Sequence, residues 1–342
     1  MTDQQPRTTD RDQAAAAETV APAQGPVAPL EEFGVLVGVD GSDQSISAAR
    51  WAQREARARQ VPLTLVTAYT VPAFWGYAAD VGGTLTDDTA LRDGVRQMLD
   101  SVAAQLDDEG PAPTLRIETG DAAGVLVDLS RQAELLVSGA RGRGGFLGRL
   151  LGSVSSALPG HAHCPVAIIP AGEDASRAEA GTPVVVGVDG SEQGRAAALV
   201  AAHEARLRGA DLRVLAVLPP VSPSNAWLTV SVDDQAVQDE LRTRLDQGVA
   251  WLRDEFPDLA VTGELRSGSP VELLAQYTET ARLTVVGTRG LGGFAGALLG
   301  STSQGVAVHA KGPLMVVPFR EDVRLGNRGK YGPLSGRDDA EG

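Results

Sequence analysis

Val37-Gly38-Val39-Asp40-Gly41-Ser42 recurs 149 positions later as Val186-Gly187-Val188-Asp189-Gly190-Ser191. In each copy an apolar run ends at an aspartate, which is followed by a glycine and a serine. A short apolar run favours a buried strand, and the residues after it favour a turn from which a helix begins. The two stretches therefore predict the same strand–turn–helix unit at two places in the chain.

A glycine pattern further along each copy is also repeated. Gly139-Ala140-Arg141-Gly142, nine residues and Gly152-Ser153 return as Gly287-Thr288-Arg289-Gly290, nine residues and Gly300-Ser301. Here the offset is 148, and the stretch that begins at His161 matches the one that begins at His309 at the same offset. Repeats at a nearly constant offset indicate that one domain of about 140 residues has been duplicated.

Short apolar runs alternate with helical stretches in both copies. The first copy predicts strands at 33–39, 62–69, 114–118, 135–138 and 166–169, with helices at 43–60, 85–106, 121–131 and 153–161. The second predicts strands near 184–189, 212–217, 260–265, 283–287 and 314–317. Apolar strands that alternate with helices favour a parallel sheet covered on both faces and wound by right-handed crossovers. The expected fold class is α/β, with two doubly wound domains.

Composition divides the rest of the chain. Residues 1–31 are rich in Gln, Thr, Asp, Ala and Pro without a strand or helix period, and we expect a disordered tail there. The polar, proline-bounded stretch 171–182 is interpreted as a linker. Residues 320–342 are expected to form a second disordered tail. The two domains are thus predicted at 32–170 and 183–319.

The repeated residues converge on one crevice in each predicted domain, because ligands of open parallel sheets bind beyond the carboxyl ends of the strands. Asp40 and Gly139 follow the first and fourth strands. Gly152-Ser153 opens a helix, whose first N–H groups lack partners and whose dipole favours an anion. The amides of Ser153 and Val154 and the hydroxyls of Ser153 and Ser155 are then candidates to donate to phosphate. Their counterparts in the second copy are Ser301, Thr302 and Ser303.

Two residue pairs admit a second interpretation. Asp40 and Asp189 can accept hydrogen bonds from ribose hydroxyls, as acidic residues do in dinucleotide folds, or simply close a turn and cap a helix. Arg141 and Arg289 can pair with phosphate or remain solvated in the loop. Combined with the glycine loops, the aspartates favour the ligand role, whereas both interpretations of the arginines stay open.

The net charge of −14 and a pI near 4.8 argue against nucleic-acid and anionic-membrane partners, which need a basic surface. The single cysteine, Cys164, excludes an internal disulfide framework and is interpreted as a packing residue in a reducing compartment. No apolar run approaches the roughly 20 residues of a membrane span, and the N-terminus lacks a secretory pattern. We expect a cytoplasmic protein.

Catalytic signatures are missing from the sequence. No Walker pattern, metal-ligand spacing or Ser-His-acid grouping can be identified among its residues. His161 and His309 lie near the ends of predicted helices, where a structural role is favoured. We therefore expect neither catalytic residues nor a protein-held metal, and not a dedicated enzyme.

Both copies resemble the universal stress protein family, specifically its tandem-domain members with an ATP-binding pattern, over about 33–170 and 183–318. The resemblance is carried by Gly-x2-Gly-x9-Gly-Ser, present twice, and by the Val-Gly-Val-Asp-Gly-Ser opening. It implies adenine nucleotide alpha hydrolase-like domains, each with a five-stranded parallel sheet of order 3-2-1-4-5. It also implies that the fifth strands, Val166–Ile169 and Leu314–Val317, join at their edges in a pseudo-twofold unit.

The resemblance further implies the ligand and its contacts. ATP is expected, with Mg²⁺ accompanying the triphosphate. Asp40 is then a ribose contact, and Ala68 lends its backbone to adenine. The ribose and phosphates are held by Gly139, Arg141, Gly142, Gly152, Ser153, Val154 and Ser155. The equivalent set in the second copy is Asp189, Val217, Gly287, Arg289, Gly290, Gly300, Ser301, Thr302 and Ser303.

Several functions are compatible with this pattern. The leading hypothesis is a nucleotide-dependent stress-response sensor or regulator without dedicated catalysis, whose partners are an adenine nucleotide and either a second copy of the chain or a regulatory protein. Slow ATP hydrolysis or phosphoryl transfer is the enzymatic alternative. A nucleotide-independent scaffold and a cyclic-nucleotide-binding protein are the others. Whether ATP, ADP, AMP or cyclic AMP is bound stays open.

Overall fold

The computed structural model describes residues 32–70, 89–107, 110–142, 151–170, 181–219, 234–291 and 298–332. The predicted N-terminal tail, nearly all of the predicted linker and the last ten residues of the chain lie outside these ranges. So do the excursions of both glycine loops, at 143–150 and 292–297.

The first domain alternates strands with helices in the predicted order. Its elements are β1 (Val35–Gly38), α1 (Asp43–Arg59), β2 (Leu63–Tyr69), α3 (Thr89–Ala103), β3 (Thr114–Thr119), α4 (Ala122–Leu129), the 3-10 turn η1 (Ser130–Gln132), β4 (Leu135–Gly139), α5 (Ser153–His161) and β5 (Val166–Ile169).

The second domain repeats that order. Its elements are β6 (Val184–Val188), α6 (Glu192–Leu207), β7 (Leu212–Leu218), α7 (Asp234–Glu255), β8 (Val261–Ser267), α8 (Pro270–Thr280), β9 (Leu283–Gly287), α9 (Ser301–His309) and β10 (Leu314–Val317). A 3-10 helix, η4 (Val323–Tyr331), follows.

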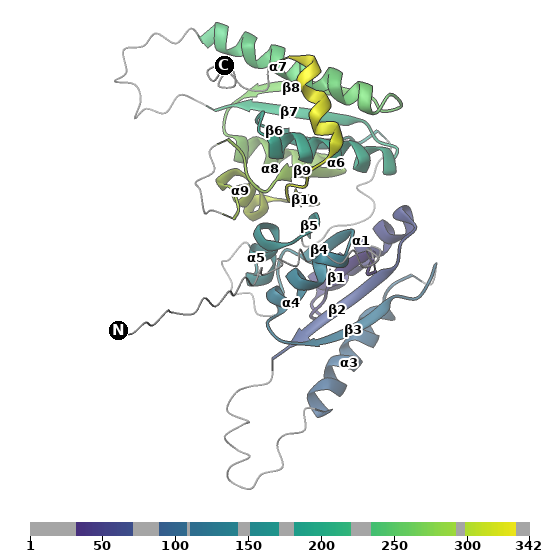
Figure 1. Ribbon diagram of the computed structural model, residues 1–342. Helices are drawn as coiled ribbons and strands as arrows, with labels where there is room; N and C mark the ends of the chain where they lie inside the picture. The colour runs from purple at the N-terminus through teal and green to yellow at the C-terminus, as the bar shows by residue number, and fades with distance from the viewer. Residues whose placement is uncertain are drawn as a thin grey trace, which may run out of the picture.

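The strands form one ten-stranded sheet of order β3-β2-β1-β4-β5-β10-β9-β6-β7-β8 (Figure 1). Within each half the strands are parallel and follow the order 3-2-1-4-5, which confirms the α/β topology expected from the sequence. The two halves meet where β5 pairs antiparallel with β10, with Leu314 opposite Ile168 and Val316 opposite Val166. Each apolar edge strand is therefore covered by the other, which removes an association liability.

The turn after the first strand of each domain has the same construction. Gly41 and Gly190 adopt positive φ angles of 75° and 85°, a region that favours glycine. Ser42 then caps α1, because its hydroxyl accepts a hydrogen bond from the Ser45 amide at 3.2 Å. In the second domain, Ser191 caps α6 in the same way. The repeated Asp-Gly-Ser triplet thus ends a strand and starts a helix.

Two apolar layers sandwich the sheet. Alternate strand residues such as Val35 and Val37 pack with helices α1, α3, α6 and α7 on one face. Leu36 and its equivalents pack with α4, α5, α8 and α9 on the other. The strands are apolar throughout because both faces are buried, and both layers continue across the junction of the domains.

A buried cluster of charges also joins the domains. Glu55 and Arg59 of α1 lie 149 positions before Glu204 and Arg208 of α6. Arg59 binds Glu204 at 2.6 Å, and Arg208 binds Glu55 at 2.6 Å. Each arginine also pairs with the glutamate of its own helix. We call these four residues the interdomain quartet.

The quartet is buried and balanced. Its side chains are between 3% and 10% exposed. Burial alone would raise the pKa of Glu204, but the guanidinium groups of Arg208 and Arg59 outweigh burial and hold that pKa below the usual range. The cluster therefore keeps the Glu204 carboxylate ionised inside the protein.

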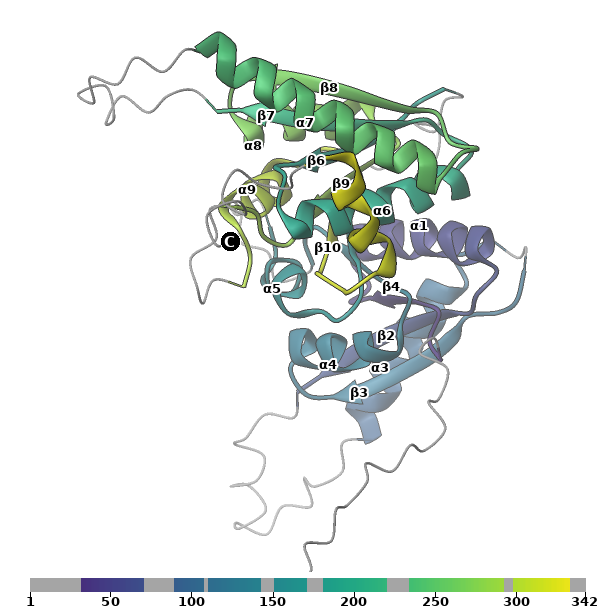
Figure 2. The same ribbon diagram turned by 45° about the horizontal axis from the view of Figure 1, so that its top comes forward.

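One expectation about the C-terminus is wrong. We expected a disordered tail from residue 320, but η4 packs along α6 and α7 (Figures 1 and 2). Tyr331 donates a hydrogen bond to Asp254, Asn327 donates to Glu255 at 2.9 Å, and Arg328 is buried. The polar composition of this stretch led to the wrong expectation, because its polar side chains form hydrogen bonds with helix α7.

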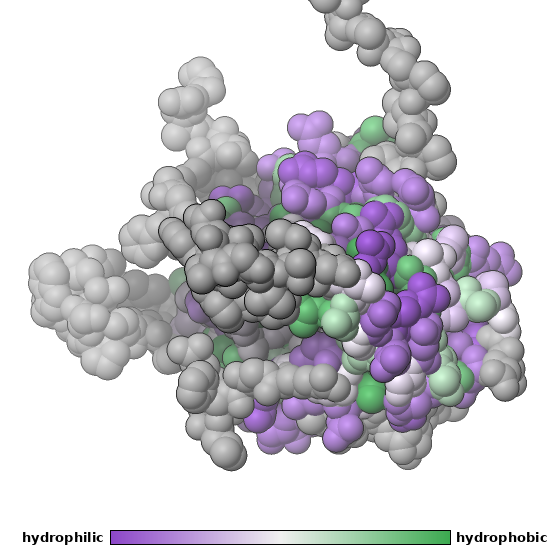
Figure 3. Space-filling view, turned by 90° about the horizontal axis from the view of Figure 1, so that it is seen from below, coloured by the Kyte–Doolittle hydropathy of each residue, from purple (hydrophilic) through white to green (hydrophobic). Residues whose placement is uncertain are grey.

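The surface agrees with the acidic composition. The part of it coloured in Figure 3 is mainly hydrophilic, with small and separate hydrophobic patches. Among the described residues, no helix is both long and apolar enough to cross a membrane. Cys164 is fully buried, and burial raises the pKa of its thiol to about 12, as expected of a packing residue.

Candidate functional site

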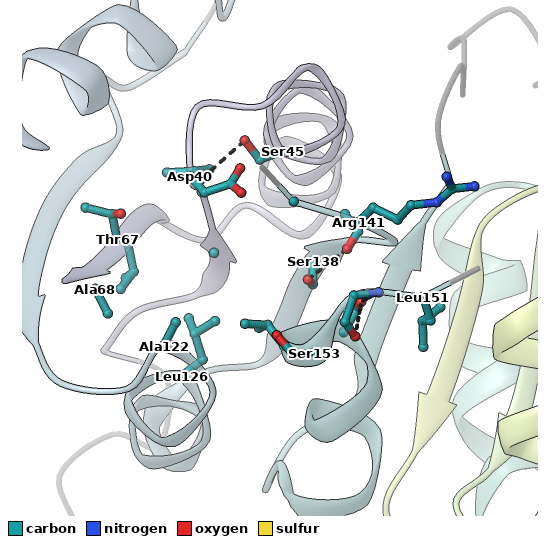
Figure 4. A pocket seen from close by; sticks show the side chains of 18 residues that line it. Asp40, Ser45, Thr67, Ala68, Ala122, Leu126, Ser138, Arg141, Leu151 and Ser153 are labelled. Atoms are coloured by element: carbon teal, nitrogen blue, oxygen red, sulfur yellow. Dashed lines mark hydrogen bonds between the residues drawn. The ribbon is translucent and has the colours of Figure 1, made fainter. Parts of the chain in front are cut away.

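A cavity of about 460 Å³ opens at the carboxyl ends of β1, β2 and β4 in the first domain (Figure 4). All nine residues predicted for the first copy line it: Asp40, Ala68, Gly139, Arg141, Gly142, Gly152, Ser153, Val154 and Ser155. Residues up to 115 positions apart in the sequence therefore meet around one space.

The N-terminus of α5 forms one wall. The Gly152 amide donates to the Ala140 carbonyl at 2.8 Å, and the first helical hydrogen bond runs from Ser156 back to Gly152 at 3.0 Å. The amides of Ser153, Val154 and Ser155 belong to the first turn, where helical geometry offers no acceptor. Three N–H groups and the positive end of the helix thus face the cavity, an arrangement suited to an anion.

Asp40 faces that helix from the opposite side (Figure 4). Its Oδ1 accepts hydrogen bonds from the Ser42 amide at 3.0 Å and from the Ser42 hydroxyl at 2.6 Å. Its Oδ2 lies toward Gly142, on the glycine loop. The carboxylate therefore closes the turn and also borders the cavity, so the two interpretations of this residue are compatible.

The loop glycines are needed for close approach rather than for an unusual φ. A Cβ at Gly142 would lie 2.3 Å from Oδ2 of Asp40, and one at Gly290 would lie 2.1 Å from Oδ2 of Asp189. Neither glycine has a positive φ. A side chain at either position would collide with the carboxylate, which explains why the loop pattern and the Asp-Gly-Ser triplet occur together.

The predicted donation of the Ser155 hydroxyl to phosphate is not the contact that the structure shows. Ser155 is 2% exposed, and its hydroxyl donates to the Ala140 carbonyl at 2.7 Å. In the second domain, the Ser303 hydroxyl donates to the Gly287 carbonyl at 2.6 Å. A hydroxyl has one proton, so these serines hold the loop against the helix and leave the amides to face the cavity.

Arg141 is exposed at the rim. Its amide donates to Oε1 of Gln44 at 2.8 Å, and its guanidinium points away from Asp40 (Figure 4). Arg289 is exposed in the same way. Each arginine therefore lines its cavity with an exposed side chain, and both interpretations of that side chain stay open.

A second cavity, of about 280 Å³, occupies the equivalent place in the second domain. All nine predicted residues line it: Asp189, Val217, Gly287, Arg289, Gly290, Gly300, Ser301, Thr302 and Ser303. Gly300 donates to the Thr288 carbonyl at 2.7 Å, and Gln304 donates to Gly300 at 2.9 Å. The polar frame of the first cavity is thus repeated.

Sequence reasoning missed the apolar walls. The first cavity is also lined by the apolar Val66, Ala122, Leu126 and Leu151, and the second by Leu215, Pro270, Leu274 and Leu299. The signal was available, since the two sets occupy equivalent positions in the two copies. Residues of this kind provide the apolar surface that small-molecule sites use for a planar or hydrophobic group.

Reactive groups are sparse around both cavities. The described lining of each holds one carboxylate and one arginine near its mouth, and no histidine, lysine or cysteine. Within the described ranges, no group of three His, Cys, Asp or Glu side chains could hold a metal ion. His161 and His309 contact the carbonyls four residues earlier in their own helices. The cavities can therefore donate hydrogen bonds to an anion from helix amides, and they can accept hydrogen bonds through one carboxylate each.

Comparisons with known proteins agree with this architecture. The model of the universal stress protein family matches residues 34–170 and 182–318. A universal stress protein of Mycobacterium tuberculosis is 38% identical over 297 residues, which cover 83% of this chain and 96% of the relative. Another from the same organism is 35% identical over 309 residues, covering 84% and 98%. The solved structure of a universal stress protein from Archaeoglobus fulgidus shares the fold with a TM-score of 0.58 at 18% identity, covering 86% of this chain and 98% of that one.

Proposed function

This chain belongs to the universal stress protein family, and we propose that each of its domains binds ATP, so that the protein acts as a nucleotide-dependent regulator of the stress response. The observation that carries the proposal is the same in both domains. A helix N-terminus, whose first-turn amides helical geometry leaves without an acceptor, faces an aspartate across a cavity at the carboxyl ends of the strands.

The phosphates, the ribose and the adenine of the nucleotide each suit a different part of the cavity. Phosphate oxygens accept from the first-turn amides of α5 or α9, an interaction worth about 0.3–2 kcal/mol for a single charge near a helix terminus. Ribose hydroxyls donate to Asp40 or Asp189. The apolar walls, including Ala68 and Val217, take the adenine.

Mg²⁺ enters the proposal as a companion of the triphosphate. The described lining supplies no cluster of carboxylates for it, so the phosphate oxygens and water are its expected ligands. When bound, the ion neutralises charge on the triphosphate. The protein's own part is to orient the nucleotide through amides and one carboxylate.

Regulation without dedicated catalysis is favoured by what surrounds the cavities. Attack on a phosphate by water or by Ser153 needs a base within hydrogen-bond reach. The only described acid in the first cavity is Asp40, whose Oδ1 is engaged by Ser42. Nucleotide occupancy would instead change the surface around the cavity mouth, where Arg141 and Arg289 are exposed to a partner.

Calorimetric titration of the purified chain with ATP and Mg²⁺ tests the proposal. We expect heat of binding that saturates near two nucleotides per chain. Adenosine serves as the matched control because it lacks the phosphates, and it should bind at least about tenfold more weakly, since charge-assisted hydrogen bonds contribute about 1.5–3 kcal/mol each. No detectable binding of ATP would leave the scaffold hypothesis as the better account.

Mass spectrometry of the ligand released from freshly purified, denatured protein identifies what the cavities hold. ATP is the expected species. Recovery of cyclic AMP alone would overturn the proposed ligand while keeping the site. Conversion of bound ATP to ADP in a single turnover, lost in Ser153→Ala, would instead establish the enzymatic alternative.

A further inference from the structure

The second domain holds another cavity, of about 450 Å³, between α6, α7, η4 and the sheet. It lies on the face of the sheet opposite to the site described above, since its strand residue Val214 belongs to the α6–α7 layer whereas Leu215 of that site belongs to the α8–α9 layer. Val188, Asp189, Val217 and Pro270 border both. Its volume is in the range of small-molecule sites.

The wall of this cavity is mainly apolar. Side chains from α7 and the strands surround most of it: Val214, Leu218, Leu241, Leu245, Leu252 and Leu265. Such a lining accommodates a hydrocarbon chain or ring, because removing apolar surface from water is favourable.

Two donors in this wall are buried without acceptors. Arg328 is 6% exposed, and its Nη1 has no hydrogen-bond partner, while its Nη2 reaches the Arg244 carbonyl at 3.4 Å. Trp251 is 1% exposed, and its Nε1 also lacks a partner. Buried donors are almost always satisfied in native proteins. A pair of them at one cavity indicates an acceptor that the described residues do not supply.

The charges around Arg328 favour an anion as that acceptor. Burial, and then repulsion by Arg195, lower the pKa of Arg328. Arg244 is engaged by Glu240 at 2.6 Å. Asp189 directs its two oxygens to backbone amides at 3.0 and 2.7 Å. None of the described carboxylates forms an ion pair with Arg328.

Gly248 is a third, independent feature. It lies in the interior of α7, where glycine destabilises a helix relative to alanine. An added Cβ would meet nothing within 4 Å, because the residue faces this cavity. Helix α7 thus has glycine, a weak helix former, at the position where a side chain would enter the cavity.

We propose that this cavity binds a small carboxylate with an apolar body, its head group at Arg328 and Trp251 and its body along α7. A planar guanidinium suits the two oxygens of a carboxylate, and the indole N–H is a second donor. This site adjoins the second nucleotide cavity and shares four bordering residues with it, but Arg328 and Trp251 line this cavity and not that one. The proposal does not rest on ATP binding in either domain.

Titration of the full-length chain with decanoate tests the proposal, with decanol as the neutral probe of the same chain length. We expect one decanoate per chain and at least about tenfold weaker binding of decanol. Arg328→Gln should weaken decanoate binding by about tenfold or more and leave decanol unchanged. Lys330→Gln, which removes a charge from the same 3-10 helix outside the cavity, should leave both unchanged.

Gly248→Leu keeps the test decisive if Arg328→Gln fails to fold. Leucine is a good helix former and enters open space, so we expect a stable variant that loses decanoate while retaining its ATP titration. Equal affinity for decanoate and decanol, equal affinity for inorganic phosphate and decanoate, or unchanged binding in a folded Gly248→Leu would each overturn the proposal. Loss of ATP binding with decanoate binding intact would count against the nucleotide proposal alone.

Discussion

The two nucleotide cavities share a polar frame but differ in their walls. In both, the glycine before the helix donates to the carbonyl of the second loop residue, and the aspartate accepts from the amide of the serine two residues later. Yet the first cavity measures about 460 Å³ and the second about 280 Å³. The second wall has larger side chains at equivalent positions: Leu215 for Val66, Val217 for Ala68, Pro270 for Ala122 and Val286 for Ser138.

The difference separates two determinants of binding. The frame consists mainly of backbone groups, together with one aspartate side chain and a glycine that leaves room for it, and both copies retain it. The wall consists of side chains, which can diverge after duplication without disturbing the sheet. We therefore expect phosphate recognition to be common to the two domains, and recognition of the base to differ.

The largest effect on the free energy of unfolding is expected at the interdomain quartet, which joins the two domains. Arg59 contacts Glu55, Glu204 and Glu134, whereas Arg208 contacts only the two quartet glutamates. Arg59→Met leaves the buried carboxylates of Glu55 and Glu204 to share one cation, Arg208, and should lower the free energy of unfolding by about 3–5 kcal/mol. Arg208→Met should cost less. Urea denaturation at pH 7 measures both.

Exposed Arg96, paired with Asp100 on α3, provides the control. Arg96→Met should change the free energy of unfolding by less than about 0.5 kcal/mol. Because the folded pKa of Glu204 is lowered, its stabilising effect is present above the usual glutamate pKa of about 4.3 and is lost as the pH falls below it. Glu204→Gln should reduce this dependence of the unfolding free energy on pH in the acid range. Equal losses for Arg59→Met and Arg96→Met would contradict the role assigned to the quartet.

The frame is tested by one substitution in each domain. Gly142→Val places a side chain against Asp40, and Gly290→Val does the same against Asp189. Each should weaken ATP binding at its own site by about a hundredfold, about 2.7 kcal/mol, because the loop must move away from the carboxylate. Calorimetry should then find one nucleotide per chain instead of two.

Gly94→Val is the matched control for the frame. An added Cβ there meets nothing within 4 Å, so two nucleotides should still bind. If Gly142→Val and Gly290→Val kept two sites of unchanged affinity, the close approach of loop and carboxylate would have no role in binding.

Much of this frame was predictable from the sequence. The repeated motifs predicted the α/β fold, and the family resemblance that they carry implied the strand order and eighteen of the residues that line the two cavities. The bounds Ser153–His161 and Val166–Ile169 were predicted without error. Strand and helix signals are local, and parallel strands bring their carboxyl ends to one edge.

The contacts that sequence reasoning missed are set by packing. Nothing in the composition around Ser155 says that its proton goes to the Ala140 carbonyl, because that choice depends on how the loop meets the helix. The order of η4 was missed for a related reason. Its polar residues bond to α7, and α7 is 68 or more positions away in the sequence.

The walls can be exchanged between the domains. Val217→Ala with Pro270→Ala gives the second cavity the side chains of the first at two of the four differing positions, and Ala68→Val narrows the first. We expect about fivefold tighter ATP binding at the enlarged site and about fivefold weaker binding at the narrowed one, roughly 1 kcal/mol each, the scale of one or two methylene groups.

Each wall variant is best titrated in a chain whose other site is disabled, by Gly142→Val in the first domain or Gly290→Val in the second. Only one site then binds nucleotide. Adenosine and ATP should respond in parallel, since the wall faces the base. Ribose triphosphate should bind each wall variant as it binds the corresponding parent. An unchanged preference between the two sites after the exchange would mean that wall volume does not govern affinity.

The smallest effect is expected at the loop ties. Gln44 binds the Arg141 amide at 2.8 Å, whereas its equivalent, Gln193, accepts from the Thr288 hydroxyl at 3.2 Å. Copy one has Ala140 at the position of Thr288. Thr288→Ala removes one hydrogen bond between loop and helix and should cost about 0.5–1.5 kcal/mol of unfolding free energy.

The loss of stability in Thr288→Ala should be confined to the second domain. If the tie only holds the loop, Thr288→Ala weakens ATP at the second site by less than about threefold, because the amides of α9 that face the phosphates remain in place. Ala140→Thr in the first domain should restore no stability, since Gln44 is already engaged by a backbone amide. A large loss of affinity in Thr288→Ala would mean instead that the two frames are not equivalent, and that copy two depends on a side chain where copy one uses its backbone.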